Sequence, residues 1–214
     1  MFYNRKDIMI DTNDVISFFD RLASGWDDNM VRNEDVIKTI LDNAEVGSGK
    51  DILDVACGTG VLIPDYCKRN VKSVTAIDIS PKMIEIAKEK FKGPDAGSRF
   101  SLGDTEIEII CGDVETYDFG RLFDCIVIYN AFPHFPDPDR LISGLSGKLK
   151  PGGIFTIAHG MSREKINAHH HGSAMHVSNG LMDADKLAEI FSKSLKVTQV
   201  ISDDRMYQVA GIRK

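Results

Sequence analysis

A glycine-rich turn follows directly after a short apolar run in the stretch ILDVACGTG, residues 52–60. Glycine lacks a Cβ, so the backbone at Gly58 and Gly60 can pass close to a bound ligand. Asp78 ends the next apolar run, twenty residues after Gly58. An acidic side chain at this place can accept hydrogen bonds from both hydroxyls of a ribose. The spacing therefore predicts a nucleoside-binding site.

The residue at position 63 argues against a dinucleotide as the ligand. The dinucleotide pattern G-x-G-x-x-G needs a third small residue so that the helix can pack closely on the strand, and Ile63 occupies that position. An NAD-dependent oxidoreductase is therefore the less favoured alternative.

A plainer interpretation also stays open for Asp54, Asp78 and Asp113, because aspartate is a common capping residue of turns.

A longer motif extends the match to a known family. Asp54, Ala56, Gly58 and Gly60 occupy the four fixed positions of Asp/Glu-x-Gly-x-Gly-x-Gly, with Ala56 in place of the first glycine. The stretches AIDIS (76–80), CGDVETYDF (111–119), FDCIVIYNAFPHF (123–135) and LKPGGIFTI (149–157) follow in order. Together they resemble the motifs of class I S-adenosylmethionine-dependent methyltransferases. FFDRLASGWDD (18–28) also loosely resembles the lead-in segment of the ubiquinone/menaquinone-biosynthesis type.

This resemblance implies S-adenosylmethionine as the cofactor and a role for each matching residue. Asp54 is expected to orient the methionyl ammonium and Asp78 to bind the ribose hydroxyls. The other expected contacts are backbone at Ala56, Gly58 and Gly60 along the amino-acid and ribose parts, Ile79 and Met83 on an adenine face, Asp113 and the Val114 N–H at the adenine edge, Asn130 at the methionyl end and Trp26 in the closing segment.

Histidines are the candidates for proton transfer. Methyl transfer is an in-line displacement, and an acceptor that carries a proton also needs a base, which histidine supplies near neutral pH. His134 follows the fourth predicted strand and His159 ends the fifth, where this fold places its ligands. Four more histidines lie in the insertion: His169, His170, His171 and His176. They could bind a zinc-like ion or could be solvated loop residues, and no metal site is predicted.

Aromatic residues are expected near the opening of the site. They are predicted to form an apolar wall for the acceptor and a cation–π face for a sulfonium: Phe18, Phe19, Trp26, Tyr129, Phe132 and Phe135. For Phe18 and Phe19 the alternative is that they anchor the first helix in the core. The segments 11–30 and 161–182 are predicted to act as lids that exclude water.

The apolar pattern predicts the elements that position these residues. Strands are expected at 51–56, 73–79, 105–113, 123–131, 152–160, 195–202 and 206–214, and helices at 11–29, 33–44, 61–70, 80–91, 137–149 and 182–194. Residues 93–104 are expected to be a loose connection. Apolar strands joined by helices predict a Rossmann-like, doubly wound α/β fold. We expect a mostly parallel seven-stranded sheet with an antiparallel last strand and an N-terminal helical lid.

Length and composition predict one domain over residues 1–214. At 43% hydrophobic residues the chain can bury one sizeable core. We expect N-terminal helices or a lid at 1–45, a cofactor-binding core at 50–160, an insertion at 161–182, and a C-terminal helix and β-hairpin at 183–214.

The net charge of −6 argues against a nucleic-acid partner and favours small neutral or cationic partners. No membrane partner and a cytoplasmic location are expected, because the sequence lacks a long apolar run and a signal-peptide pattern, and its four cysteines suit reduced thiols. The expected activity is methyl transfer to a small molecule, with the acceptor atom (O, N, S or C) and the oligomeric state open. A cofactor-binding protein without catalysis is the alternative from another class.

Overall fold

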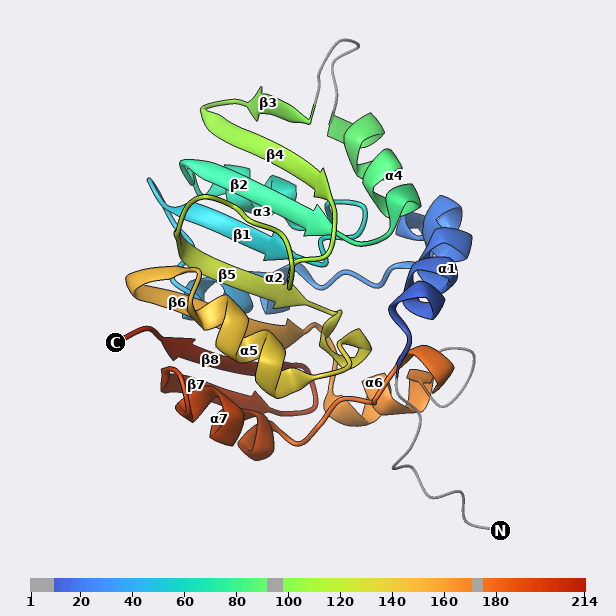
Figure 1. Ribbon diagram of the computed structural model, residues 1–214, viewed down its shortest axis with the longest axis vertical. Helices are drawn as coiled ribbons and strands as arrows, with labels where there is room; N and C mark the ends of the chain where they lie inside the picture. The colour runs from blue at the N-terminus through green and yellow to red at the C-terminus, as the bar shows by residue number, and fades with distance from the viewer. Residues whose placement is uncertain (1–9, 92–97, 171–174) are drawn as a thin grey trace.

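The computed structural model of the protein describes residues 10–91, 98–170 and 175–214, and its centre is an eight-stranded sheet (Figure 1). The strand order is β3-β4-β2-β1-β5-β6-β8-β7. The strands are β1 Asp51–Val55, β2 Ser73–Asp78, β3 Arg99–Leu102, β4 Thr105–Cys111, β5 Phe123–Tyr129, β6 Leu149–His159, β7 Lys196–Ser202 and β8 Tyr207–Ile212. The predicted Rossmann-like α/β fold is confirmed.

Parallel pairing runs from β4 through β2, β1 and β5 to β6, and β8 is antiparallel to both β6 and β7. The predicted antiparallel last strand is thus present. The predicted strand number of seven was wrong, because β3 lies inside the stretch expected to be a loose connection. This strand pairs antiparallel with β4 through a two-residue turn, Gly103–Asp104. Its residues are mostly exposed at the sheet edge, so its sequence lacks the apolar run that marked the other strands.

Helices cover both faces of the sheet. One face packs against α2 Glu34–Asn43, α3 Ile63–Lys68 and α4 Pro81–Phe91, and the other against α5 Pro138–Ser146 and α7 Ala184–Ser192. Every residue of β1 and β2 is consequently buried. Two further helices, α1 Thr12–Leu22 and α6 Arg163–His170, lie beyond the carboxyl ends of the parallel strands (Figure 1). Short 3₁₀ turns complete the chain: η1 Ala23–Gly25, η2 Asp27–Asn29, η3 Phe132–His134 and η4 Met175–Val177.

The helix starts follow from local sequence. The expected cap Ser80 accepts a hydrogen bond from the Met83 N–H at 3.2 Å, and Pro81 is the first residue of α4. Asp11 and Asn33 cap α1 and α2 in the same manner. The Ser80 cap sets where the chain turns from β2 into α4, at the edge of the sheet that carries the candidate site.

The N-terminal segment is attached to this edge by polar contacts. Asp20 of α1 accepts a hydrogen bond from the Ser80 hydroxyl at 2.6 Å. Asp27 of η2 accepts one from the Thr59 hydroxyl at 2.6 Å and pairs with Lys90 at 2.5 Å. Residues 12–29 therefore lie across the ends of β1 and β2, as a covering segment would.

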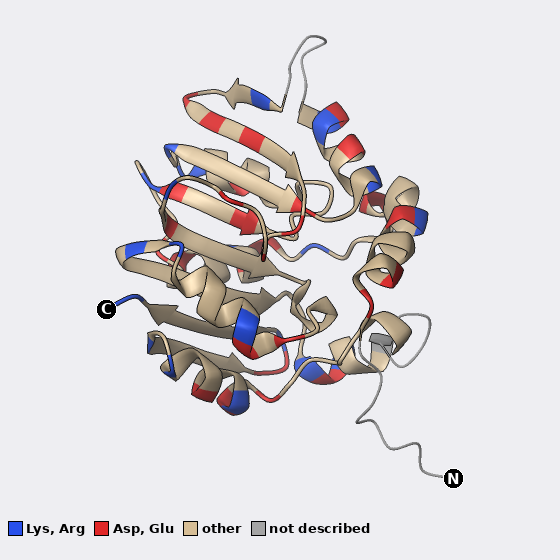
Figure 2. Ribbon diagram, in the orientation of Figure 1, with Lys and Arg blue, Asp and Glu red and all other residues tan. Residues whose placement is uncertain are grey.

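Charged residues of both signs are interspersed over the described part of the fold (Figure 2). None of the described helices is both long and apolar enough to cross a membrane.

Candidate active site

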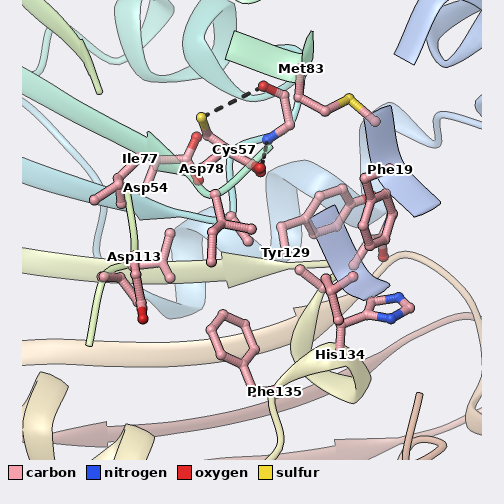
Figure 3. A pocket seen from close by; sticks show the side chains of 18 of the residues that line it. Phe19, Asp54, Cys57, Ile77, Asp78, Met83, Asp113, Tyr129, His134 and Phe135 are labelled. Atoms are coloured by element: carbon pink, nitrogen blue, oxygen red, sulfur yellow. Dashed lines mark hydrogen bonds between the residues drawn. The ribbon is translucent and has the colours of Figure 1, made fainter. Parts of the chain in front are cut away.

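A cavity opens at the carboxyl ends of β1, β2, β4 and β5, with an empty volume of about 1170 Å³ that includes space open to solvent (Figure 3). Its wall consists of strand ends, the glycine turn, one face of α1 and the segment around η3. Eleven of the predicted site residues line it: Trp26, Asp54, Ala56, Gly58, Asp78, Ile79, Met83, Asp113, Val114, Asn130 and His134. Gly60 and His159 are not among the lining residues.

The glycine turn has a left-handed backbone at all three motif positions. The φ angles are +54° at Ala56, +56° at Gly58 and +77° at Gly60. At Gly60 a Cβ would stand 2.7 Å from the Phe91 ring and 2.9 Å from Cδ1 of Ile63. Gly60 is therefore required for helix packing and not for contact with the cavity. Ala56 adopts a conformation that favours glycine, which makes it a strained position.

Asp78 joins the end of β2 to the glycine turn. Its Oδ2 accepts the Gly58 N–H and its Oδ1 accepts the Ser80 N–H, both at 2.8 Å. Burial raises the pKa of this carboxyl, and the backbone N–H donors partly offset that effect. Each carboxylate oxygen has two lone pairs, so further donors such as ribose hydroxyls can still be accepted. Asp78 is both a turn cap and a wall residue of the cavity.

Asp54 is the most strongly perturbed acid in the cavity. It is the last residue but one of β1, and only 3% of its surface is exposed. Burial raises its pKa to about 8, with a further contribution from the Asp78 carboxylate, while the Tyr66 hydroxyl acts in the opposite direction. A cationic group placed here would stabilise the charged form, so the site is built to favour a positively charged ligand atom.

The turn after β4 supplies the third acid. Asp113 Oδ1 accepts the Glu115 N–H at 2.9 Å, and the Asp113 carbonyl accepts from Thr116 and Tyr117. Asp113 thus caps a turn, as the plainer interpretation expected, and also lines the cavity. Val114 beside it is buried, and Ile79 and Met83 add apolar wall between β2 and α4.

Asn130 holds the end of β5 in shape. Its φ is +56°, its backbone N–H donates to Ala158, and its Oδ1 accepts the Gly160 N–H, both at 2.9 Å. The N–H is therefore engaged within the sheet, which leaves the carbonyl as the backbone group that can serve a ligand. Tyr129 precedes it in the cavity wall, and burial raises the pKa of its hydroxyl.

His134 lies in the cavity wall at the end of η3. Its Nδ1 is 2.8 Å from the Val177 carbonyl, and the Phe19 ring meets its ring edge-on at 4.9 Å. Because a carbonyl only accepts, Nδ1 carries the proton, and the neutral ring then has its lone pair on Nε2. The tautomer suited to a general base is therefore set by the insertion.

The side chain of Asn179 also ties the insertion to η3. It donates to the Phe135 carbonyl at 3.2 Å and to the Pro136 carbonyl at 3.4 Å, while its backbone N–H bonds to Pro133. Residues 175–181 thus clamp the turn that carries His134, although no described residue of 161–182 lines the cavity. The described residues of this segment support the cavity wall, and its role as a lid stays a prediction.

His159 has a different setting. It is the last residue of β6, its residue is 1% exposed, and its ring meets Tyr207 of β8 at 6.1 Å. The strand-end position predicted an orientation toward the ligand. A strand alternates its side chains between the two faces, however, and the pairing with β8 places His159 in the sheet interior. The geometry offers His134, and not His159, to an acceptor in this cavity.

Of the predicted aromatic residues, some line the cavity and others lie in the core. Phe19, Trp26, Tyr129 and Phe135 line the cavity, whereas Phe18 packs with Val15 and Val177, and Phe132 joins the sheet core. His176 is exposed beside Phe18. His171 and the side chains of His169 and His170 lie outside the described residues. Among residues 10–91, 98–170 and 175–214 no three potential metal ligands cluster.

Sequence reasoning missed several wall residues. Thr12 and Val15 share the cavity face of α1 with Phe19, a spacing of three and four residues that the helical period could have revealed. Met30 and Glu115 also line the cavity, but they sit in turns, where the sequence has no period to show which way a side chain points.

A sheet of this order, with acids at the ends of three neighbouring strands and a glycine turn between them, defines a Rossmann-like α/β protein. Residues 53–157 match the family model described as "Methyltransferase domain". Over these residues the chain is similar to methyltransferases.

Individual relatives agree with this placement. A malonyl-[acyl-carrier protein] O-methyltransferase of Acetivibrio thermocellus is 29% identical over 153 residues, which cover 70% of this chain and 50% of that protein. A ubiquinone biosynthesis O-methyltransferase of Coxiella burnetii is 33% identical over 105 residues, which cover 49% of this chain and 41% of that protein. The chain spans about half the length of the curated relatives it matches.

Among solved structures, the N-methyltransferase NodS of Bradyrhizobium japonicum in complex with S-adenosylhomocysteine superimposes with a TM-score of 0.68. The two chains are 17% identical, and the match covers 92% of this chain and 97% of the other. At this identity the likeness concerns the fold.

Proposed function

We propose that this protein binds S-adenosylmethionine and transfers its methyl group to a small-molecule acceptor. The observation that carries the proposal is the convergence of Asp54, Asp78 and Asp113, from the ends of three neighbouring strands, on one cavity beside the glycine turn. When bound, S-adenosylmethionine supplies a methyl group on a positively charged sulfur.

The donor and acceptor groups of the cavity fit this cofactor. Asp78 would accept from the ribose hydroxyls while it keeps its bonds to Gly58 and Ser80. Asp54 would hold the methionyl ammonium, which suits a buried carboxyl whose charged form needs a cation. Ile79, Met83 and Val114 would flank the adenine, with Asp113 at its amino edge; the left-handed turn at Ala56 and Gly58 keeps side chains out of the way.

His134 is the proposed base. With Nδ1–H donated to the Val177 carbonyl, Nε2 is the nitrogen that would take a proton from the acceptor. Phe19 and Phe135 stand beside it in the wall and would keep water from the acceptor.

The proposal also covers the acceptor class, the cellular location and the domain organisation. A small-molecule acceptor and the absence of a nucleic-acid partner are supported by a cavity with no Lys or Arg among its described lining residues. A cytoplasmic location is supported by the free state of all four cysteines. One domain over residues 1–214 is supported by a single sheet that runs from β3 to β7.

Calorimetry tests the cofactor. We expect S-adenosylmethionine and S-adenosylhomocysteine to bind and NAD not to bind. Binding of NAD alone would refute the proposal. An acceptor screen over thiols, phenols, quinols and amines, with S-adenosylhomocysteine release as the readout, tests the transfer. If the sulfur ligands bind and no acceptor in a broad screen gives release, the alternative of a non-catalytic binding protein is favoured.

Substitution of His134 tests the base. His134→Ala and His134→Gln are expected to lower turnover of a protic acceptor by about 10²–10⁴-fold and to leave the affinity for S-adenosylhomocysteine unchanged. His176→Ala is the matched control, because this exposed histidine packs on Phe18 and does not line the cavity. Full turnover in both His134 variants would remove His134 from the mechanism.

A further inference from the structure

The half of the cavity away from the proposed cofactor site has a wall of its own. Figure 3 shows His134 and Phe135 across the cavity from Asp78 and Met83. This acceptor wall comes from α1, the end of η2 and the segment around η3, and none of its residues carries a fixed charge: Thr12, Val15, Phe19, Met30, Ala131, His134, Phe135 and Pro136.

Ring contacts hold the acceptor wall in shape. The Phe19 ring meets His134 at 4.9 Å with planes at 89°, and it meets Trp26 at 5.6 Å with planes at 73°. Phe19 is thereby fixed between the two, and Phe135 adds a second apolar ring to the lining. Aromatic and aliphatic groups arranged around one histidine suit a flat apolar molecule with a single protic group.

The charges around the cavity have one sign. Four carboxylates line it, from Asp54, Asp78, Asp113 and Glu115, and the described lining residues include no Lys or Arg. Two cations near the cavity are held in ion pairs, one of them with Glu115 itself. Arg140 grips Glu115 with two hydrogen bonds of 2.8 and 2.9 Å from an exposed position, and Arg32 pairs with Glu34 and Asp65.

The described lining residues would therefore offer an anionic acceptor no cationic side chain. Its carboxylate or phosphate would lose its hydration against an apolar wall and would gain no ion pair from a described lining side chain. An uncharged acceptor avoids both penalties and places its protic group at His134. The S-adenosylmethionine half uses the acids for its own cationic groups, so their charge does not require a cationic acceptor.

We propose that the acceptor is an uncharged, flat, apolar molecule with one protic group next to His134, and that the site rejects acceptors that carry a carboxylate or a phosphate. The inference rests on the proposed function of the same cavity. It deepens that function by naming the chemical class of the acceptor.

Matched pairs of acceptors test the proposal. Catechol is compared with 3,4-dihydroxybenzoate and benzyl mercaptan with 4-(mercaptomethyl)benzoate, and malonyl coenzyme A is included as an anion whose own carboxylate could be methylated. The uncharged member of a pair is expected to have a kcat/KM at least about 100-fold higher. Calorimetry on the protein loaded with S-adenosylhomocysteine gives a readout independent of turnover: the uncharged member should bind and the carboxylate should not.

A gain-of-charge variant sharpens the test. Phe135→Arg places a cation in the acceptor wall and is expected to lower the preference for the uncharged member by at least about tenfold. Leu122→Arg adds the same charge at an exposed position outside the cavity and should leave the preference unchanged. A shift in both variants would point to overall charge and overturn the role of the wall.

The failures of the two proposals differ. Equal binding and turnover of carboxylate and uncharged acceptors, or binding of neither uncharged compound, overturns the acceptor class while S-adenosylhomocysteine still binds. Absence of S-adenosylhomocysteine binding itself overturns the proposed function. Loading is followed through the fluorescence of Trp26, which is the one tryptophan of the chain and lines the cavity.

Discussion

Binding of the cofactor should release a proton from Asp54. In the ligand-free chain, burial and the neighbouring Asp78 raise the pKa of the Asp54 carboxyl to about 8, so most of it is protonated at pH 7. The ammonium of S-adenosylhomocysteine would stabilise the carboxylate and bring its pKa back toward the ordinary range. The protonated fraction lost on binding is then about 0.9 at pH 7, about 0.5 at pH 8 and about 0.1 at pH 9.

Calorimetry in buffers of different ionisation enthalpy measures this release. The observed binding enthalpy should vary with the buffer at pH 7 and almost not at pH 9. Asp54→Asn should remove the dependence at pH 7, because the amide has no proton to lose. Asp118→Asn, which alters an exposed loop carboxylate outside the cavity, is the control and should keep it. A buffer-independent enthalpy at pH 7 in the natural protein would refute the reasoning.

The same carboxyl predicts a pH dependence of stability. The pKa of Asp54 is raised on folding, so its contribution to stability is full below pH 4 and is lost as pH rises toward 8. The loss has an upper limit on the order of 5 kcal/mol. The difference in Tm between Asp54→Asn and the natural protein, both without ligand, should therefore grow from pH 5 to pH 9. A constant difference would mean that Asp54 is ionised throughout this range.

Three further substitutions have defined outcomes. Ala56→Gly should raise the free energy of unfolding by about 0.5–1 kcal/mol, because φ is +54° at this residue. The same change at helical Ala188 should lower the free energy of unfolding by about 1 kcal/mol. Urea unfolding measures both changes, and a lower stability of Ala56→Gly would contradict the backbone strain at Ala56. Asp78→Ala should weaken S-adenosylhomocysteine binding by about 1–3 kcal/mol in calorimetry, and unchanged affinity would mean that its carboxylate faces away from the ligand. Asn179→Ala should lower kcat several-fold without changing the affinity for S-adenosylhomocysteine, because it loosens the turn that carries His134. A change in affinity alone would mean that the contacts of Asn179 do not serve to position His134.

Most of the fold was predictable because the relevant signals are local. Buried parallel strands are mainly apolar, so β1, β2, β5 and β6 stand out from the helices between them, and β4 stands out by its isoleucines although it also carries Glu106 and Glu108. Caps such as Ser80 and the glycine turn identify where each strand gives way to its helix. The edge strand β3 escaped prediction for the opposite reason: exposed residues paired on one side need no apolar pattern.

The acids of the candidate site were also predictable. Parallel strands bring their carboxyl ends to one edge, so Asp54, Asp78 and Asp113 must lie near one another whatever the loops do. The two predicted residues that the cavity excludes show what was missing. Gly60 is demanded by the contact with Phe91, and His159 is turned inward by the pairing of β6 with β8.

By itself, the sequence determined most strands and helices, though not β3 or α6, and also the glycine turn and the acids at the strand ends, because each depends on neighbours along the chain. Only the tertiary structure placed His134 in the cavity wall and His159 in the sheet interior, and showed that the insertion orients His134 through the Val177 carbonyl. It also showed that the acceptor wall has no fixed charge. These properties arise from contacts between segments far apart in the chain, whose distances and directions no local pattern records.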